Sequence, residues 1–237
     1  MKKIKSVFFG IWNYFSVWER ALWILSVVLI VATFFAFDGA GYLTLIASLI
    51  GVTSLILCAK GNPLGQGLMI IFSVIYGIIS FECGYYGEMT TYVCMTLPMS
   101  IASLVSWIRN PYEKGRAEVR VERLEWWDAP LLSVLTILIT VAFYFILGLL
   151  GTANLLPSTI SVATSFIAVY LTFRRSPYFA LAYAANDVVL ILLWILMAVN
   201  DPSYISVITC FVVFLVNDLY GFFSWLKMAK KQDERGI

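Results

Sequence analysis

The chain has 237 residues, of which 61% are hydrophobic and 13% are charged. Soluble domains are about 45–50% apolar and about 25% charged, and one soluble core could not hide this much apolar surface, so the composition predicts an integral membrane protein. The net charge of +2 gives no reason to expect a nucleic-acid partner, and the absence of histidine removes the commonest metal ligand, so we expect no metal and no cofactor.

Residues 4–18 are rich in aromatic side chains, follow N-terminal lysines and lack a small-residue cleavage site. This pattern favours an amphipathic helix at the membrane interface over a cleaved signal peptide. After it come eight continuous apolar runs, each long enough to cross about 30 Å of hydrocarbon as a helix. The predicted spans are 21–37, 41–59, 64–82, 89–108, 129–150, 156–173, 177–198 and 203–226.

The basic residues all fall on one side of this eight-span topology. They precede the first span, occupy the connections after the second, fourth and sixth spans, and follow the last span. The opposite connections carry only acids, namely Asp38, Glu82, Glu88 and Asp201. Because cytoplasmic connections are enriched in Lys and Arg, the pattern predicts a multi-pass inner-membrane protein with both termini in the cytoplasm.

The tryptophans and cysteines have simpler interpretations. Four tryptophans fall at the predicted cytoplasmic interface, where an aromatic belt is expected: Trp107, Trp126, Trp127 and Trp225. Cys58, Cys94 and Cys210 lie in apolar runs and are expected to be small buried side chains, whereas Cys83 lies near a helix end. The cysteines show no C-x-x-C spacing, so a disulfide framework is not expected.

Two parts of the chain resemble each other. The connection 59–63 matches 173–177, because each closes one span and opens the next at a proline, and Ser106-Trp107 matches Ser224-Trp225. Parallel repeats of this kind place substrate at their interface near the membrane midplane. The expected organisation is an interfacial helix and first span (1–40), a three-helix repeat (41–108), a cytoplasmic connector with a linker helix (109–155), a second repeat (156–228) and a cytoplasmic tail (229–237).

Two carboxylates lie inside predicted spans, each directly after an asparagine, in Asn186-Asp187 and Asn217-Asp218. Both pairs lie about 12–15 Å from the cytoplasmic ends of their helices, close to mid-bilayer. A carboxylate at that depth costs at least a few kcal/mol unless it faces a cavity or a partner. The pairs therefore indicate a substrate pathway, while a structural role, in which these groups hydrogen-bond neighbouring helices, stays open.

Aromatic side chains share the helix faces of these acids. Tyr183 lies four residues before Asp187 and Trp194 seven after it, and carboxyl, amide and aromatic groups together suit a flat, hydroxylated, cationic ligand. Pro98 lacks an N–H and predicts a kink in its helix near Cys94, which could line the site or serve packing alone. The candidate substrate-binding residues, with those that the repeat adds from the first unit, are Gln66, Ser73, Tyr92, Ser100, Tyr183, Asn186, Asp187, Trp194, Asn217, Asp218 and Tyr220.

Several motifs resemble those of the PnuC family of bacterial nicotinamide riboside transporters, over about residues 40–228. They are Tyr85-Tyr86-Gly87-Glu88 opening a helix that ends in Trp107, the stretch from Arg174-Arg175 to Asn186, and the closing Tyr220-Gly221 and Trp225. The resemblance implies an all-α, SWEET-like fold of eight transmembrane helices in a 1+3+1+3 arrangement, and a homotrimer. It also implies uptake of nicotinamide riboside for pyridine nucleotide biosynthesis, by facilitated diffusion and with trapping by cytosolic phosphorylation.

The chain departs from the family pattern around the expected ligand. Family members often have tryptophans four and seven residues before the asparagine that matches Asn186, where this chain has Ala182 and Phe179. Polar residues usual in the first unit are replaced at Phe72, Tyr92 and Ser100. These differences leave open a carrier of another nucleoside, a deoxynucleoside, thiamine or riboflavin.

Two other classes of protein fit parts of the pattern. Paired intramembrane acids could serve an aspartyl enzyme as acid and base, but the Gly-x-Gly-Asp context of such enzymes is missing. A subunit of a larger pump would need a partner ATPase, because this chain has no Gly-x-x-x-x-Gly-Lys loop. We therefore expect a carrier rather than an enzyme.

Overall fold

The computed structural model describes residues 14–37, 41–113, 117–152 and 154–235, and every regular element in these ranges is a helix. Pro111 and Val119 form an isolated β-bridge. The elements are α2 (Val17–Ala36), α3 (Tyr42–Cys58), α4 (Pro63–Glu82), α5 (Tyr86–Thr90), the π-helix η1 (Thr91–Thr96), α6 (Leu97–Arg109), α7 (Asp128–Leu149), α8 (Leu155–Phe173), α9 (Tyr178–Ala198), the 3₁₀ turn η2 (Pro202–Tyr204) and α10 (Ile205–Glu234).

Seven helical segments within the described ranges are long and apolar enough to cross a membrane, with α5, η1 and α6 forming one of them. The remaining predicted span corresponds to α3, which is apolar but only 17 residues long. The protein thus has the helices of a multi-pass membrane protein, and the count of eight spans stays a prediction.

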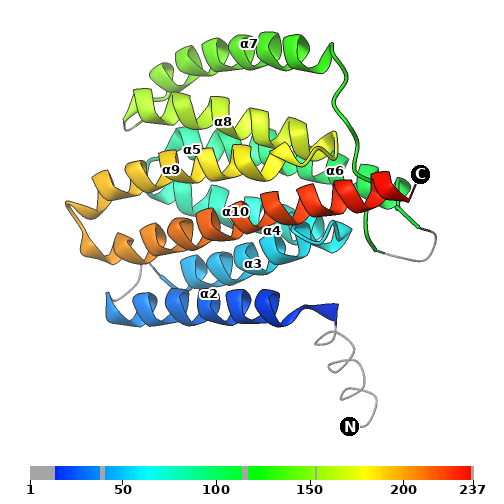
Figure 1. Cartoon of the computed structure of the whole chain (residues 1–237). Helices are drawn as coiled ribbons and strands as arrows, with labels where there is room; N and C mark the ends of the chain where they lie inside the picture. Colours follow the sequence, from blue (N-terminus) through cyan, green and yellow to red (C-terminus); the bar gives the residue numbers. More distant parts are fainter. Residues whose placement is uncertain (1–13, 38–40, 114–116, 153, 236–237) are drawn as a thin grey trace.

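Six of the helices form a closed ring: α3, α4, α6, α8, α9 and α10, with α10 packing back against α3. Outside this ring, α2 packs against α3 and α10, and α7 packs mainly against α8. Figure 1 shows α2 and α7 at opposite edges of the bundle. Only Asp128 and Leu147 of α7 are buried, so most of its apolar side chains face outward, as expected of a helix that borders lipid.

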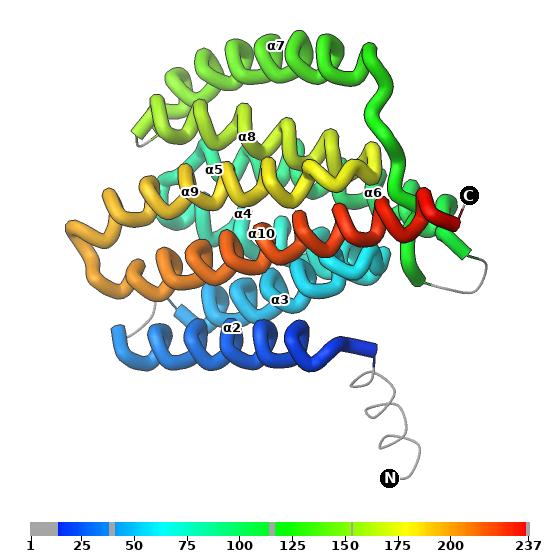
Figure 2. The backbone as a smooth tube through the Cα atoms, in the orientation of Figure 1, coloured from blue at the N-terminus to red at the C-terminus, as the bar shows by residue number. Residues whose placement is uncertain are grey.

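All Lys and Arg residues within the described ranges lie at one end of the bundle, which we call the basic end. It comprises the start of α2, the α3–α4 and α8–α9 loops, the connector (residues 110–127) and the last turns of α10. Figure 2 shows the green connector running from the start of α7 to the red C-terminal end of α10. The grouping agrees with the sequence-based topology, and the side of the membrane that this end faces stays a prediction.

The first described helix begins earlier than the sequence predicts. Ser16 caps α2, since its hydroxyl accepts from the Glu19 N–H at 3.3 Å and the Glu19 carboxylate accepts from the Ser16 N–H at 2.6 Å. This capping box starts a new helix at Val17. The interfacial helix predicted for 4–18 therefore does not extend to residue 18, and its residues 4–13 lie outside the described ranges.

Trp107 and Trp225 do not belong to the predicted aromatic belt, because both are fully buried, whereas Trp126 is 87% exposed. The Trp107 indole N–H donates to the Thr172 carbonyl at 3.0 Å, and that of Trp225 donates to the Cys58 carbonyl at 2.8 Å. A buried indole needs such an acceptor, since an unpaired buried donor costs about 1–3 kcal/mol. The sequence could not distinguish these buried rings from interfacial ones.

The serines before these tryptophans make matching contacts. Ser106 donates to the Phe173 carbonyl at 3.3 Å, and Ser224 donates to the Ala59 carbonyl at 2.7 Å. The end of α6 is thereby attached to the end of α8, and α10 is attached in the same way to the end of α3. We call these two Ser-Trp contacts the clasps. Their indole rings meet with centroids 5.3 Å apart, which closes the basic end of the ring.

Residues 91–96, just before Leu97 and Pro98, adopt a π-helix, and the kink predicted near Cys94 stays a prediction. Pro98 cannot donate to the Cys94 carbonyl, which removes one bond of the α-helical ladder. Cys94 is exposed, so the prediction that it is buried is wrong, whereas Cys58 and Cys210 are buried as expected. All four cysteines are free.

Candidate functional site

A small cavity lies inside the ring of helices, with walls from α3, α4, η1, α8, α9 and α10. It is lined by Leu55, Met69, Phe72, Tyr92, Thr96, Ser165, Tyr183, Asn186, Asp187, Phe214 and Asp218. Its volume is about 20 Å³, which is room for about one water molecule. The structure therefore shows this ring closed around a polar centre.

The two intramembrane acids meet in this cavity. Asp187 of α9 and Asp218 of α10 are each 4% exposed, and both line this cavity. One oxygen, Asp187 Oδ2, is buried and has no hydrogen-bond partner among the described residues. Within the described part of the chain, no Lys or Arg lines the cavity. The pair thus brings two carboxyl groups and an unbonded acceptor to one place.

Asn186 is held by a row of hydroxyl groups on α8. Its Oδ1 accepts from Thr164 at 2.8 Å, from Ser165 at 3.0 Å and from Ser161 at 3.3 Å. Three donors on one oxygen fix the orientation of the amide. The Nδ2 group donates to no residue that the structure describes, so the amide presents a hydrogen-bond donor beside the acid pair.

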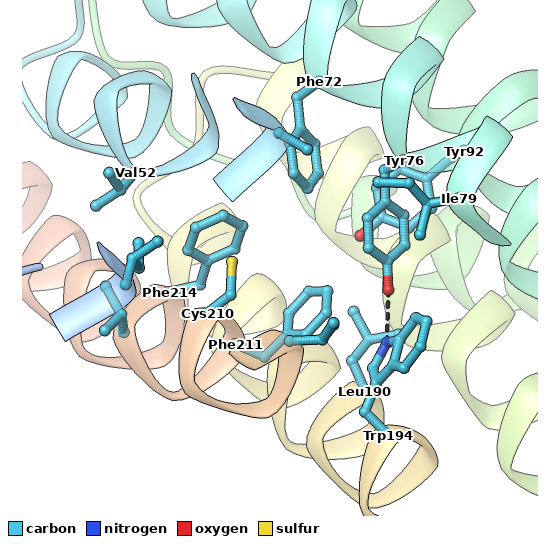
Figure 3. Packing of buried hydrophobic residues seen from close by; sticks show 14 of the residues in the cluster. Val52, Phe72, Tyr76, Ile79, Tyr92, Leu190, Trp194, Cys210, Phe211 and Phe214 are labelled. Atoms are coloured by element: carbon cyan, nitrogen blue, oxygen red, sulfur yellow. Dashed lines mark hydrogen bonds between the residues drawn. The ribbon is translucent and has the colours of Figure 1, made fainter. Parts of the chain in front are cut away.

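Aromatic rings form the wall of the cavity on the α4 side. Phe72, Tyr92 and Phe214 line the cavity, and Tyr76 lies behind them. The Tyr76 ring stacks on Phe72 with centroids 5.4 Å apart and has its centroid 4.5 Å from that of Tyr92. Figure 3 shows the Tyr76 and Tyr92 rings next to each other. Phe72 also lies 5.7 Å from the Phe214 ring. Flat apolar surfaces next to carboxyl and amide groups can hold a planar ligand that has both a ring face and polar edges.

Asn186, Asp187, Asp218, Tyr183 and Tyr92 are the predicted site residues that line the cavity. The others do not line it: Gln66, Ser73, Ser100, Trp194, Asn217 and Tyr220. Trp194 is fully buried in the core and donates to the Tyr76 hydroxyl at 2.6 Å (Figure 3). Asn217 faces α2, where its Nδ2 donates to the Ser26 hydroxyl at 3.0 Å.

The remaining predicted residues have partners close to their own helices or at the basic end. Tyr220 donates to Glu19 at 3.1 Å, near the start of α2. Gln66 donates to Cys58 Sγ at 3.2 Å, and Ser73 donates to the Met69 carbonyl of its own helix at 2.7 Å. Ser100 is buried in α6. Their polar groups stabilise local packing in this conformation.

Sequence reasoning missed Ser165 and Thr96, which line the cavity, and Ser161 and Thr164, which hold Asn186. A signal for the α8 residues was present, because Ser158, Ser161 and Ser165 are spaced by three and four residues and share one helix face. Isolated serines are common in membrane helices, but a hydroxyl stripe on one face marks a side that packs against polar groups.

The sequence analysis placed Glu88 in a connection, but the residue lies in α5 and is fully buried. Neither of its carboxyl oxygens accepts a hydrogen bond from a residue that the structure describes. Gly87 allows this burial, because a Cβ at that position would lie 2.9 Å from the Ser158 side chain of α8. The prediction was wrong because the helix begins at Tyr86, before the predicted first residue of this span.

Comparisons with known proteins give this geometry a context. A sequence profile of the family described as nicotinamide mononucleotide transporter matches residues 41–227. A protein of Neisseria mucosa named nicotinamide riboside transporter PnuC is 23% identical over 231 residues, which is 96% of this chain and 86% of the relative. The protein of the same name from Haemophilus influenzae is 23% identical over 236 residues, which is 97% of each.

A solved structure has the same fold. The crystal structure of the vitamin B3 transporter PnuC superposes with a TM-score of 0.81, over 92% of this chain and 94% of that one, at 18% identity. The alternative of an intramembrane aspartyl enzyme is excluded by the family match, because its members are membrane transporters. Since the profile spans most of the chain, the protein belongs to the nicotinamide mononucleotide transporter family, which contains the PnuC transporters.

Proposed function

We propose that this protein carries nicotinamide riboside across the bacterial inner membrane and binds it in the central cavity. The observation that carries the proposal is the convergence of Asp187, Asp218 and Asn186 with aromatic rings inside a closed ring of helices. Nicotinamide riboside has a flat cationic pyridinium and a hydroxylated sugar, which these groups complement. The names of the two relatives support this choice of substrate.

Each group has a distinct role in this proposal. The acid pair offsets the positive charge of the ligand and accepts from ribose hydroxyls through Asp187 Oδ2, which has no other partner. Asn186 donates from Nδ2 to a ligand oxygen. Phe72, Tyr92 and Phe214 supply ring faces for stacking and cation–π contact.

The closed cavity implies that the ring opens to admit substrate. Pockets for small ligands are about 300–1,000 Å³, far larger than the 20 Å³ found in this conformation. We infer that units 41–108 and 156–228 act as two three-helix repeats that separate alternately at each end of the ring. Opening at the basic end would require the clasps to part, because they join the ends of α6 and α8, and of α10 and α3.

The remaining features of the transport cycle follow the family resemblance. We propose that the basic end faces the cytoplasm and that substrate moves by facilitated diffusion. A cytosolic kinase would then trap it as the phosphorylated product. We also propose a homotrimer, which native mass spectrometry of the detergent-solubilised protein would test; a monomer that persists in several mild detergents would contradict it.

Uptake of labelled nicotinamide riboside into proteoliposomes that contain this chain alone tests the function. We expect uptake down the concentration gradient without ATP or an imposed ion gradient, and at least about a tenfold loss for Asp218→Asn. Asp201→Asn is the matched control, because Asp201 is exposed and its side chain accepts from the Ser203 N–H in a turn. No uptake by the chain alone would favour a subunit of a larger transporter, and full activity of Asp218→Asn would place the site elsewhere.

A second candidate function is transport of a related ligand, namely another nucleoside, a deoxynucleoside, thiamine or riboflavin. It is favoured by Phe72 and Tyr92, whose rings occupy cavity positions where the family usually has polar groups. Competition by each unlabelled compound against labelled nicotinamide riboside would rank the ligands. If a compound competes at a lower concentration than unlabelled nicotinamide riboside does, that compound is the preferred substrate, and the proposed binding site is unaffected.

A further inference from the structure

A second and larger pocket lies at the basic end, outside the ring of helices. Its volume is about 480 Å³, within the range of small-molecule sites. The connector, the α8–α9 loop and the last turns of α10 form its walls. The lining residues are Asn110, Arg120, Val121, Glu122, Arg123, Arg175, Ala229, Gln232 and Asp233.

The backbone around this pocket is firmly held. The Arg120 N–H donates to the Asn110 carbonyl at 2.9 Å, and the Glu122 N–H donates to the Arg175 carbonyl at 3.1 Å. Between them, the Val121 N–H donates to the buried Gln232 side chain at 2.8 Å. The pocket is therefore a built feature in which the connector is tied to both α10 and the α8–α9 loop.

Three guanidinium groups line this pocket, and two of them have acidic partners among the described residues. Arg123 pairs with Asp233 at 2.6 Å and Arg175 pairs with Glu122, whereas Arg120 has no ion pair with a described residue. The Arg175 Nε–H is buried and has no acceptor. Burial, and then the like charges of Arg174 and Arg120, lower the pKa of Arg175 against the effect of Glu122. The pocket thus holds excess positive charge and an unused donor.

We propose that this pocket binds the phosphate group of a soluble small molecule, such as a sugar phosphate, between Arg120 and Arg175. Guanidinium groups match phosphate because they donate several hydrogen bonds in one plane. Ala229 and Asp233 follow the buried Trp225 by four and eight residues, which places them about 6–12 Å further along α10. The pocket therefore lies further from the membrane than the clasps do. This position favours a soluble phosphate ester over a lipid headgroup.

The site is separate from the central cavity but adjoins the clasps. Arg175 Nη1 donates to the Ser106 hydroxyl at 2.6 Å, and Ser106 belongs to the clasp between α6 and α8. A ligand that draws the Arg175 guanidinium toward the pocket competes with this contact. The proposal stands whichever nucleoside or vitamin the central cavity carries.

Calorimetric titration of the full chain in nanodiscs of phosphatidylcholine tests the site. Inorganic phosphate and ribose 5-phosphate are expected to bind, and ribose is not. Arg120→Gln should weaken binding of ribose 5-phosphate about tenfold, through loss of a charge-assisted hydrogen bond. Arg120 is exposed, so this variant is expected to fold normally. Lys227→Gln removes an equal charge from a different pocket at the same end and should bind like the parent.

Two outcomes would overturn the proposal. If Arg120→Gln and Lys227→Gln weaken binding equally, the basic end attracts an adventitious ion only. If nanodiscs that contain phosphatidylglycerol abolish binding of ribose 5-phosphate at constant ionic strength, a lipid headgroup is the occupant rather than a soluble ester.

Discussion

The clasps at the basic end and the acid pair at the centre of the ring show two uses of buried polar groups. In the clasps, each indole and each serine hydroxyl donates to a backbone carbonyl of another helix. At the centre, Asp187 Oδ2 is equally buried and has no partner. Buried polar groups are usually bonded, so an unbonded one indicates a group kept for another purpose. The comparison supports a structural role for the clasps and the proposed ligand binding for the centre.

Removing a clasp should have the largest effect on stability. Trp225→Ala is expected to lower the free energy of unfolding by about 3–5 kcal/mol, because it deletes a fully buried ring and its hydrogen bond. Denaturant or thermal unfolding in detergent measures the change, with the exposed Trp126→Ala as the control at about 0.5 kcal/mol or less. Equal stability of the two variants would contradict a structural role for the clasp.

Asp187→Asn should weaken ligand binding without lowering the free energy of unfolding, unlike Trp225→Ala. We expect affinity for the transported ligand to fall about tenfold or more, since a charged acceptor is lost. Stability should stay the same or rise, because a neutral amide is cheaper to bury than a carboxylate without a basic partner. Binding and unfolding are measured on the same preparation. A loss of stability as large as that of Trp225→Ala would mean that the acid pair holds the bundle together.

Asn186→Ala should give a smaller loss of ligand affinity, of about five- to tenfold, because one neutral donor disappears. It should also reduce stability by about 1–2 kcal/mol, since the hydroxyls of Ser161, Thr164 and Ser165 lose a common acceptor. Ser161→Ala removes only the longest of these bonds and serves as the control. Titration of ligand and thermal unfolding would separate the two effects, and an affinity loss no greater than for Ser161→Ala would argue against direct contact.

Glu88→Gln should have the smallest effect on stability and ligand affinity. It tests a buried acid that lies outside both the clasps and the central cavity. Glu88 is fully buried with neither carboxyl oxygen bonded, but it does not line the central cavity. Its replacement by a neutral amide is expected to raise the free energy of unfolding by up to about 1 kcal/mol and to leave ligand affinity unchanged. If affinity falls, the ligand site extends toward α5.

The sequence predicted the helices and the central acids well, because both follow from one-dimensional signals. Apolar runs and charge-bearing connections locate the spans, and depth along a helix follows from counting residues at a fixed rise. Asp187 and Asp218 were placed at one depth in this way, and they meet in the structure. The rotation of each helix about its axis has no such signal.

Helix rotation explains the candidates that lie outside the cavity. Asn217 directly precedes Asp218, but adjacent residues point about 100° apart on a helix, so Asn217 faces α2 while Asp218 faces the cavity. The same ambiguity hid the buried positions of Trp107 and Trp225, since a tryptophan near a helix end fits either lipid or core. Tertiary packing determines which face of each helix points to the core, to the cavity or to lipid. Residue patterns in a single sequence do not reveal that packing.

The outer helix α7 affects the direction in which the following helices cross the membrane. An odd number of crossings leaves a chain on the far side of the bilayer, and α6 ends at the basic end whereas α8 starts at the opposite end. With only two residues buried, α7 adds little to the interior, yet it returns the chain to the side where α8 starts. In the predicted eight-span topology, a chain that lacked this crossing would insert α8 to α10 upside down, and Trp107 and Trp225 could not reach their acceptors.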